Sequence, residues 1–187
     1  IIECAPLPLK PRARLFKDGM DVLVPSVRRT PPESLSPRAK SHNYLNLIMA
    51  DMEAKAQDPE AWAILLDTRG FLTEGIGSNI FTIKDGVIYS PQEQYVLGGI
   101  SRETAIEMAA RIDVQVVTKD IDLFDAMTAD EIFLTSTSLC ICGVRSFQGR
   151  QVGDGTAAGP ITKALMNEYV DFVEYDWLGQ YLKRLED

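Results

Sequence analysis

Residues 78–90, Ser78-Asn-Ile-Phe-Thr-Ile-Lys84-Asp-Gly-Val87-Ile-Tyr-Ser90, give the clearest signal of local structure in this sequence. Two strand-like runs, 78–84 and 87–90, flank the dipeptide Asp85-Gly86. Both turn residues tolerate positive φ, which a tight turn between antiparallel strands requires. The pattern therefore predicts a β-hairpin.

Shorter signals of the same kind lie on both sides of this hairpin. Short apolar runs predict strands at 22–24, 62–66, from 71 to about 75, 114–119, 131–136, 140–146 and 151–152. Helices are predicted at about 43–57, from 101, at 121–128 and from 160. Many short strands, several joined as hairpins with helices between them, predict an α+β fold with a largely antiparallel, barrel-like sheet and flanking helices.

Prolines mark the N-terminal part of the chain. Residues 1–9 predict one strand, which Pro6 and Pro8 end. Residues 10–35 contain four further prolines and predict an interdomain connector, so that residues 36–187 form the main domain. Because the first strand has nothing before it to pair with, we expect an N-terminal portion to lie outside this chain.

Composition and charge exclude several classes of protein. With 187 residues, 45% hydrophobic and 25% charged, the chain has an ordinary globular composition. Its net charge of -8 and its lack of a basic run argue against nucleic acids and anionic membranes as partners. Three cysteines at spacings that fit neither a zinc site nor a redox pair indicate a reducing compartment, the cytoplasm. A single histidine, His42, excludes multi-histidine metal sites.

The segment Lys40-Ser-His-Asn-Tyr44 supplies a candidate nucleophile just before a predicted helix. Tyr44, Leu47, Ile48 and Met52 recur at spacings that place them on one helical face. A buried face starting there would hold Lys40 near the interior, where desolvation makes an amine more nucleophilic. The competing interpretation is a solvated, inert lysine beside a helix, which is the commoner case.

Three further polar features stand at predicted strand or helix ends. Glu74, in Glu74-Gly-Ile-Gly-Ser-Asn79, is a carboxylate that can pair with a cationic ring nitrogen, and its neighbouring glycines let a ligand approach the backbone. Gly98-Gly-Ile-Ser101 opens a helix whose free N–H groups suit a phosphate, and Thr135-Ser-Thr-Ser138 offers clustered hydroxyls. Taken singly, each has an ordinary alternative: a loop glutamate in water, a helix capped by Ser101, and a polar turn.

Together, a lysine, a lone glutamate and two phosphate-suited turns point to one cofactor, pyridoxal phosphate. These residues belong to a series of motifs in a fixed order along the chain: Lys40-x-x-Asn-Tyr44, Leu72-Thr-Glu-Gly-x-Gly-Ser-Asn79, Lys84-Asp-Gly86, Leu97-x-Gly-Ile-Ser-Arg102, Asp130-Glu-Ile-Phe-Leu-Thr-Ser-Thr137 and Gly159-Pro-Ile-Thr162. Through them the chain resembles the class IV aminotransferases, the fold-type IV pyridoxal phosphate enzymes. This family includes branched-chain and D-amino-acid aminotransferases, R-selective amine transaminases and aminodeoxychorismate lyase.

The resemblance implies roles for the residues around the cofactor ring. Lys40 is the lysine that forms the Schiff base, and Glu74 pairs with the pyridine nitrogen and keeps it protonated. Leu97 packs against the ring, and Tyr44 reaches the phenolic oxygen of the cofactor or lines the pocket.

The resemblance also implies how anionic groups are bound. Ile100 and Ser101 bind the cofactor phosphate through N–H groups and a hydroxyl, and Thr137 joins them. The turn at Thr137 and Ser138 presents N–H groups to a substrate carboxylate. No metal is implied.

The implied reaction moves an amino group between an amino acid or amine and a 2-oxo acid, and the implied partners are these small molecules and a second copy of the chain in a homodimer. Two alternatives stay open. One is elimination of pyruvate on the same fold, as in aminodeoxychorismate lyase. The other is a folded but inactive fragment that lacks the family's small N-terminal domain, of which residues 1–9 resemble only the last strand.

Overall fold

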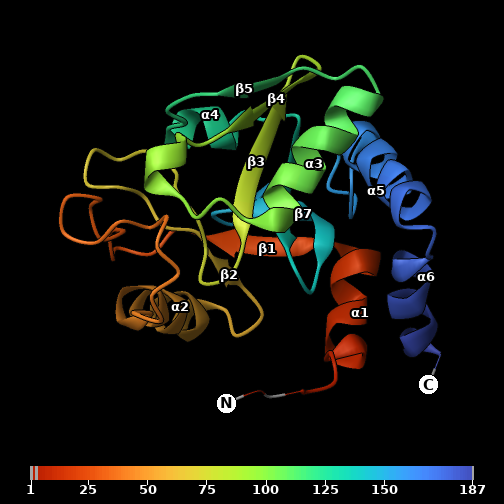
Figure 1. Cartoon of the computed structure of the whole chain (residues 1–187), viewed down its shortest axis with the longest axis horizontal. Helices are drawn as coiled ribbons and strands as arrows, with labels where there is room; N and C mark the ends of the chain where they lie inside the picture. Colours follow the sequence, from red (N-terminus) through yellow and green to blue (C-terminus); the bar gives the residue numbers. More distant parts are fainter. Residues whose placement is uncertain (1, 3, 187) are drawn as a thin grey trace.

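The structure, a computed structural model, describes residues 2 and 4–186 (Figure 1). Its helices are α1 (Leu9–Asp18), α2 (Leu45–Gln57), α3 (Ile100–Arg111), α4 (Leu123–Met127), α5 (Pro160–Val173) and α6 (Trp177–Leu182). Its strands are β1 (Met20–Leu23), β2 (Trp62–Ala63), β3 (Asn79–Lys84), β4 (Val87–Ser90), β5 (Val116–Thr118), β6 (Glu131–Ser136), β7 (Cys140–Phe147) and β8 (Arg150–Gln151). Two 3-10 turns follow β4 and α6, at Glu93–Tyr95 (η1) and Lys183–Leu185 (η2).

The strands form one mixed sheet in the order β2-β1-β7-β6-β3-β4-β5, with β8 paired to β7. Antiparallel pairs join β3 to β4, β3 to β6, β6 to β7 and β7 to β8. Parallel pairs join β1 to β2, β1 to β7 and β4 to β5. The α+β class is confirmed, but the sheet is mixed rather than largely antiparallel, and its described strands form an open path rather than a barrel. The parallel pairs escaped prediction because an apolar run does not reveal the direction of a partner far away in sequence.

The predicted hairpin is confirmed as β3 and β4. Thr82 pairs with Tyr89 and Lys84 with Val87. The turn residues Asp85 and Gly86 have φ values of 50° and 80°, as the two-residue turn requires.

The larger core lies where α3 and α5 pack against the central strands β6 and β7. Figure 1 shows these two helices side by side. Phe81 and Phe133 are cross-strand partners, and their rings stack with centroids 4.7 Å apart. Such a pair contributes about 0.5–1.5 kcal/mol beyond the burial of its surface.

Helix α2 packs through a face that shares Tyr44 and Leu47 with the predicted one but not Ile48 and Met52. The side chains that it buries are Leu47, Ala50 and Ala54. They form a second, smaller cluster with Ala63 and Leu65. Ile48 and Met52, which were predicted to be buried, are 44% and 66% exposed. The prediction was wrong because the periodicity followed the large apolar side chains, whereas small alanines make the close contact.

The N-terminal segment lacks the predicted strand, and a helix lies within the predicted connector. The described part of residues 1–9, namely 2 and 4–9, contains no strand, and α1 begins at Leu9; Ile1 and Glu3 lie outside the described residues. Helix α1 packs beside α6 (Figure 1), with the ring of Phe16 4.5 Å from that of Tyr181. The predicted connector, residues 10–35, thus contributes α1 and β1 to the main core, and the division of the chain into domains stays a prediction.

Glu131 fixes the N-terminus of α5 to the sheet. Its two carboxylate oxygens accept hydrogen bonds from the backbone N–H groups of Ile161 at 2.9 Å and Thr162 at 2.8 Å. A negative charge at this end of a helix is favoured by the helix dipole. A Cβ atom on Gly159 would lie 2.3 Å from the carboxyl carbon of Glu131, so the motif Gly159-Pro160 requires its glycine for this close approach.

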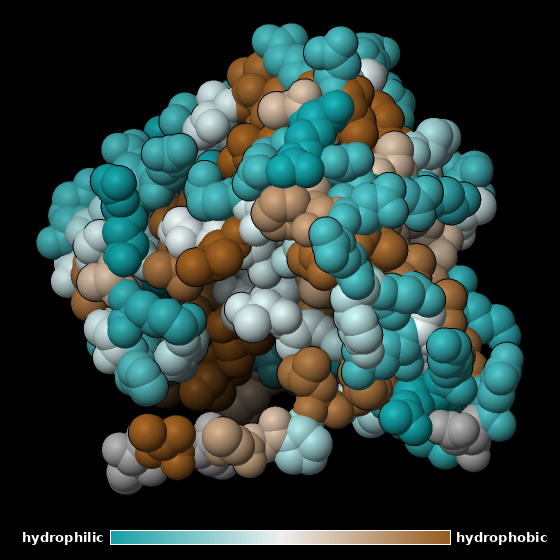
Figure 2. Space-filling model, turned by 45° about the vertical axis from the view of Figure 1, so that its right-hand side comes forward, coloured by the Kyte–Doolittle hydropathy of each residue, from teal (hydrophilic) through white to brown (hydrophobic). Residues whose placement is uncertain are grey.

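The surface is mixed in character. Figure 2 shows hydrophobic areas between hydrophilic ones on one face of the molecule, and Leu45, Met49 and Met52 of α2 are each more than half exposed. No helix among the described residues is long and apolar enough to cross a membrane. The same residues hold no cluster of three or more histidine, cysteine or acidic side chains arranged to bind a metal ion.

Candidate active site

The predicted site residues meet at one cleft. It has a volume of about 740 Å³, including the part open to solvent, which is within the usual range of small-molecule sites. Its walls come from Arg29 and from residues within 35–47, 74–79, 97–101 and 135–137. The predicted site residues that line it are Lys40, Tyr44, Glu74, Leu97, Ile100, Ser101 and Thr137. Four segments far apart in sequence thus converge, and of the predicted set only Ser138 does not line the cleft.

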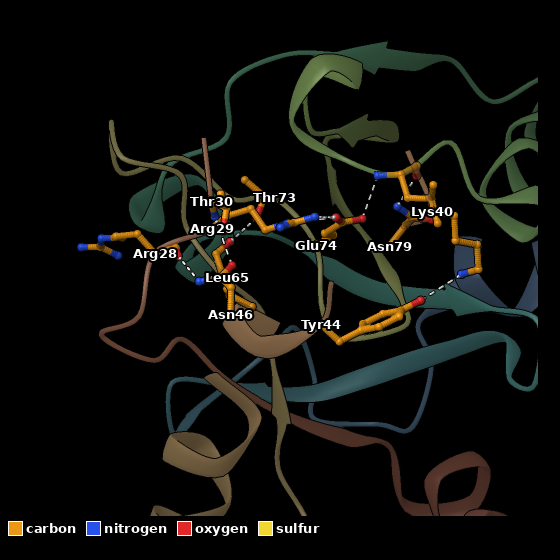
Figure 3. Close-up of polar contacts among 11 residues, drawn as sticks. Arg28, Arg29, Thr30, Lys40, Tyr44, Asn46, Leu65, Thr73, Glu74 and Asn79 are labelled. Carbon is orange, nitrogen blue, oxygen red and sulfur yellow. Dashed lines mark hydrogen bonds and ion pairs between the residues drawn. The ribbon is translucent and has the colours of Figure 1, made fainter. Parts of the chain in front are cut away.

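Lys40 and Tyr44 form one wall of the cleft. Lys40 Nζ donates a hydrogen bond to the hydroxyl of Tyr44 at 3.3 Å (Figure 3). His42 between them has a φ of 61°, a left-handed conformation that is uncommon for a residue with a Cβ atom. Lys40 is exposed, so the prediction that α2 would hold it near the interior was wrong: the buried face of the helix begins only at Leu47.

Glu74 also lines the cleft, with a side chain that is almost fully buried. Its Oε1 accepts hydrogen bonds from Arg29 Nε at 3.1 Å and Arg29 Nη2 at 3.0 Å, and its Oε2 accepts one from the backbone N–H of Leu97 at 2.8 Å. Burial raises the pKa of Glu74 above its ordinary value, against the N–H of Leu97 and the charges of Arg29 and Lys40, which act to lower it.

Helix α3 turns its N-terminus towards the cleft. Its N-cap is Gly99 rather than Ser101, which is the second residue of the helix and is buried. No side chain caps the helix, so its first N–H groups remain available to an anion. Asn79 Nδ2 donates to the carbonyl of Leu97 at 2.9 Å, and a Cβ atom on Gly99 would lie 2.4 Å from Asn79 Oδ1. Gly99 is therefore the residue that permits this close packing.

The two remaining predicted residues, Thr137 and Ser138, lie in the turn after β6 but have different surroundings. Thr137 lines the cleft, whereas Ser138 is held from the other side. The guanidinium of Arg12 on α1 donates to the hydroxyl of Ser138, and the hydroxyl of Tyr181 on α6 donates to its carbonyl. Helices α1 and α6 thus fix the outer side of the turn that carries Thr137.

Three residues of the cleft were missed from the sequence. Ser78 Oγ and Thr135 Oγ1 are buried hydroxyls without a hydrogen-bond partner among the described residues, and both residues line the cleft. The third is Arg29, which lies in a proline-rich stretch that was interpreted as a connector. No local signal marks it because its partner Glu74 is 45 positions away. The motif around Thr135 was recognised, but nothing in it distinguishes an unpaired hydroxyl from a paired one.

Comparison with known proteins identifies the family of this chain. The family model for class IV amino-transferases matches residues 3–147. The chain belongs to the class IV aminotransferase family. Two members show the degree of similarity. A protein of Methanocaldococcus jannaschii is 39% identical over 171 residues, which are 91% of this chain and 58% of that protein. The branched-chain-amino-acid aminotransferase of Pseudomonas aeruginosa is 37% identical over 159 residues, 84% of this chain and 51% of that enzyme.

Solved structures of this aminotransferase family share the fold. The branched-chain amino acid aminotransferase of Escherichia coli superposes with a TM-score of 0.80 at 32% identity, and the match covers 86% of this chain and 54% of that one. The chain thus spans about half the length of the relatives that it matches.

Proposed function

We propose that this chain carries the cofactor-binding part of a pyridoxal phosphate-dependent aminotransferase of class IV, which moves an amino group between an amino acid or amine and a 2-oxo acid. The observation that carries the proposal is the convergence of Lys40, Glu74 and the N-terminus of α3 on one cleft. An amine, a carboxylate and an anion-binding helix end are the three contacts that an aldehyde, a ring nitrogen and a phosphate need.

The residues of the cleft fit this cofactor. The walls contain unpaired buried hydroxyls at Ser78 and Thr135, and buried polar groups without partners are rare unless a ligand or water satisfies them. The donors around α3 suit a phosphate, and its helix dipole favours the negative charge. When bound, pyridoxal phosphate supplies an aldehyde that links to an amine and a ring that withdraws electrons from the bonds at the attached carbon.

Lys40 and Tyr44 act on the amino group and on the proton at Cα. Lys40 Nζ would hold the cofactor and, once freed, would take the proton from Cα of the amino donor and pass it to the cofactor. Tyr44, whose hydroxyl accepts from Nζ at 3.3 Å, would orient the amine and bind the phenolic oxygen of the cofactor. In the second half of the reaction Lys40 would move a proton in the opposite direction, from the cofactor to Cα of the product amino acid.

The remaining residues bind and orient. Glu74 would hold the proton on the ring nitrogen, and Leu97 would pack against the ring. The N–H groups and hydroxyl of Ile100 and Ser101 would bind the phosphate together with Thr137.

The substrate carboxylate and the quaternary structure complete the proposal. We assign the carboxylate to the backbone N–H groups of the turn at Thr137 and Ser138, which leaves the hydroxyl of Ser138 free for its contact with Arg12. We also propose that two copies form a homodimer, which sizing of the purified chain tests: a monomer at working concentration contradicts it.

A coupled assay tests the reaction class. The purified chain, loaded with pyridoxal phosphate, is given a branched-chain amino acid and a 2-oxo acid, and the new amino acid is measured. In parallel, release of pyruvate from aminodeoxychorismate is measured. Amino transfer that is lost in Lys40→Ala supports the proposal. Pyruvate release without amino transfer makes the chain a lyase, and cofactor binding without either reaction makes it an inactive fragment.

A further inference from the structure

Arg29 is the buried charged residue of the cleft to which the proposed reaction gives no task. Its side chain is 9% exposed and that of Glu74 is 6% exposed. Both donors of Arg29 converge on the same oxygen, Oε1, at 3.1 and 3.0 Å. Burial removes much of the hydration of such an ion pair, which costs free energy unless the geometry of the pair is good. Its position beside a ligand cleft therefore suggests a functional role.

The hydrogen bonds of Glu74 leave it with one direction in which to accept another. A carboxylate offers about four acceptor positions, two on each oxygen. Arg29 occupies both positions of Oε1, and the backbone N–H of Leu97 occupies one of Oε2. The position that remains is on Oε2, in a residue that lines the cleft. Glu74 is thus arranged to receive a single N–H donor from a ligand.

Arg29 is itself held in place by α2. Asn46 Nδ2 donates to the carbonyl of Arg28 at 2.6 Å, and the N–H of Thr30 donates to Asn46 Oδ1 at 3.1 Å (Figure 3). The N–H of Arg29 donates to the carbonyl of Leu66 at 2.8 Å. One helix therefore carries Tyr44 at its start and, two residues later, the amide that fixes the segment of Arg29.

We propose that Arg29 is a positioning residue of the cofactor site: it fixes Glu74 with one acceptor position of Oε2 open to the ring nitrogen, and it keeps the carboxylate charged. The inference rests on the proposed function and extends it to a residue outside the cofactor's direct contacts. Arg29 and Lys40 are the charged groups that act on Glu74, and Arg29 is the one that touches it. Without Arg29, burial would favour the protonated carboxyl, which cannot hold a proton on the ring nitrogen.

The first experiment needs no cofactor. The carboxyl carbon of Glu74 is assigned by its loss in Glu74→Gln and is titrated by carbon-13 NMR in the full chain. Arg29→Gln removes the charge and keeps a donor, so we expect the pKa of Glu74 to rise by about one unit or more. Arg29→Lys keeps the charge and should restore a pKa close to that of the wild type. An unchanged pKa in folded Arg29→Gln overturns the proposal.

Two further variants control for structural effects. Arg145 makes a comparable two-point contact with Asp21, at 3.0 and 2.6 Å, between β7 and β1, so Arg145→Gln should leave the titration of Glu74 unchanged. If Arg29→Gln does not fold, Asn46→Ala decides, because it frees the segment of Arg29 without touching the guanidinium. A smaller rise in the pKa of Glu74 is then expected, and no rise contradicts the proposal.

The second experiment adds pyridoxal phosphate. The visible absorbance of the loaded chain is followed with pH, and retention of the cofactor is measured by dialysis. Arg29→Gln should shift the pH profile and weaken retention about tenfold, whereas Arg145→Gln should match the wild type. A wild-type chain that takes up no cofactor refutes the proposed function, while the ligand-free titration still decides whether Arg29 controls Glu74. A loaded Arg29→Gln with the wild-type profile refutes the role of Arg29 alone.

Discussion

Glu74 and Glu131 are two buried glutamates with nearly equal exposure, 5% and 7%, and different tasks. Glu131 gives both oxygens to backbone N–H groups at the start of α5. Glu74 is fixed by Arg29 and Leu97 and lines the cleft. Burial of a carboxylate therefore does not by itself mark a functional site. What distinguishes Glu74 is that it lines a cavity and has a charged partner, Arg29, that holds one of its oxygens.

The largest expected effect is on the rate of amino transfer, where substitution of the two glutamates should have different results. Glu74→Gln removes the group that keeps the ring nitrogen protonated, so the rate of amino transfer in a single turnover should fall by about 10²-fold or more. Glu131→Gln lies outside the cleft and should change that rate far less. Rapid-mixing measurements on the loaded chain check this, and an equal loss in both variants would mean that the comparison describes stability only.

The reverse contrast is expected in folding. Glu131→Ala leaves one buried and one part-buried N–H group without an acceptor, at about 1–3 kcal/mol for a buried group, so the free energy of unfolding should fall by about 3 kcal/mol. Urea denaturation measures this loss. Cofactor affinity of the fraction that remains folded should be unchanged. A variant as stable as the wild type would show that the start of α5 does not depend on Glu131.

The dependence of stability on pH should report Glu74. Because burial raises its pKa above the ordinary value of 4.5, the folded chain binds more protons than the unfolded chain between pH 4.5 and the raised pKa. Stability contributed by this group therefore falls as the pH rises through that window. Urea denaturation over this range should show the trend in the wild type and in Glu131→Gln, and lose it in Glu74→Gln. Its persistence in Glu74→Gln would assign it to another group.

Asp21 serves as a control, because its contribution to stability should depend on pH with the opposite sign. The hydrogen bond from Arg145 lowers its pKa below 3.8, so its stabilising contribution is present above that pH and is lost as the pH falls through the lowered value. This acid-side loss should disappear in Asp21→Asn and remain in Glu74→Gln.

The smallest expected effect is a change in cofactor affinity, and it concerns two unpaired hydroxyls, one near each glutamate. Thr135 Oγ1 and Thr162 Oγ1 are both buried without a partner among the described residues, but only Thr135 lines the cleft. Thr135→Val should weaken binding of pyridoxal phosphate about three- to tenfold, the value of one hydrogen bond, and Thr162→Val should not. Equilibrium titration of absorbance measures both. Equal affinities would show that Thr135 does not contact the cofactor.

The same contrast explains what the sequence could reveal. Local patterns sufficed for the hairpin of β3 and β4, for β6 and for α5, because each depends on turn residues, apolar runs or a proline within the segment. The residues of the cleft were found through motifs that place Lys40, Glu74 and Ser101 near predicted strand or helix ends. Their convergence depends on a fold that no single motif encodes.

What escaped prediction depends on distant partners. Arg29 is defined by a carboxylate 45 residues away, and the buried face of α2 is set by alanines that fit against residues 63–65. The helix at Leu9–Asp18 formed where a connector was predicted, and its Phe16 packs on Trp177 and Tyr181 near the other end of the chain. None of these contacts leaves a trace in the local sequence.

The most direct test of the account is chemical. The chain is incubated with pyridoxal phosphate, reduced with borohydride, digested and analysed by mass spectrometry, with Lys55 as an internal control because it is an exposed lysine on α2 that pairs with Asp51. The account predicts one reduced adduct, on Lys40, that is absent from Lys40→Ala. Adducts spread over exposed lysines, or a full adduct in Lys40→Ala, would contradict it.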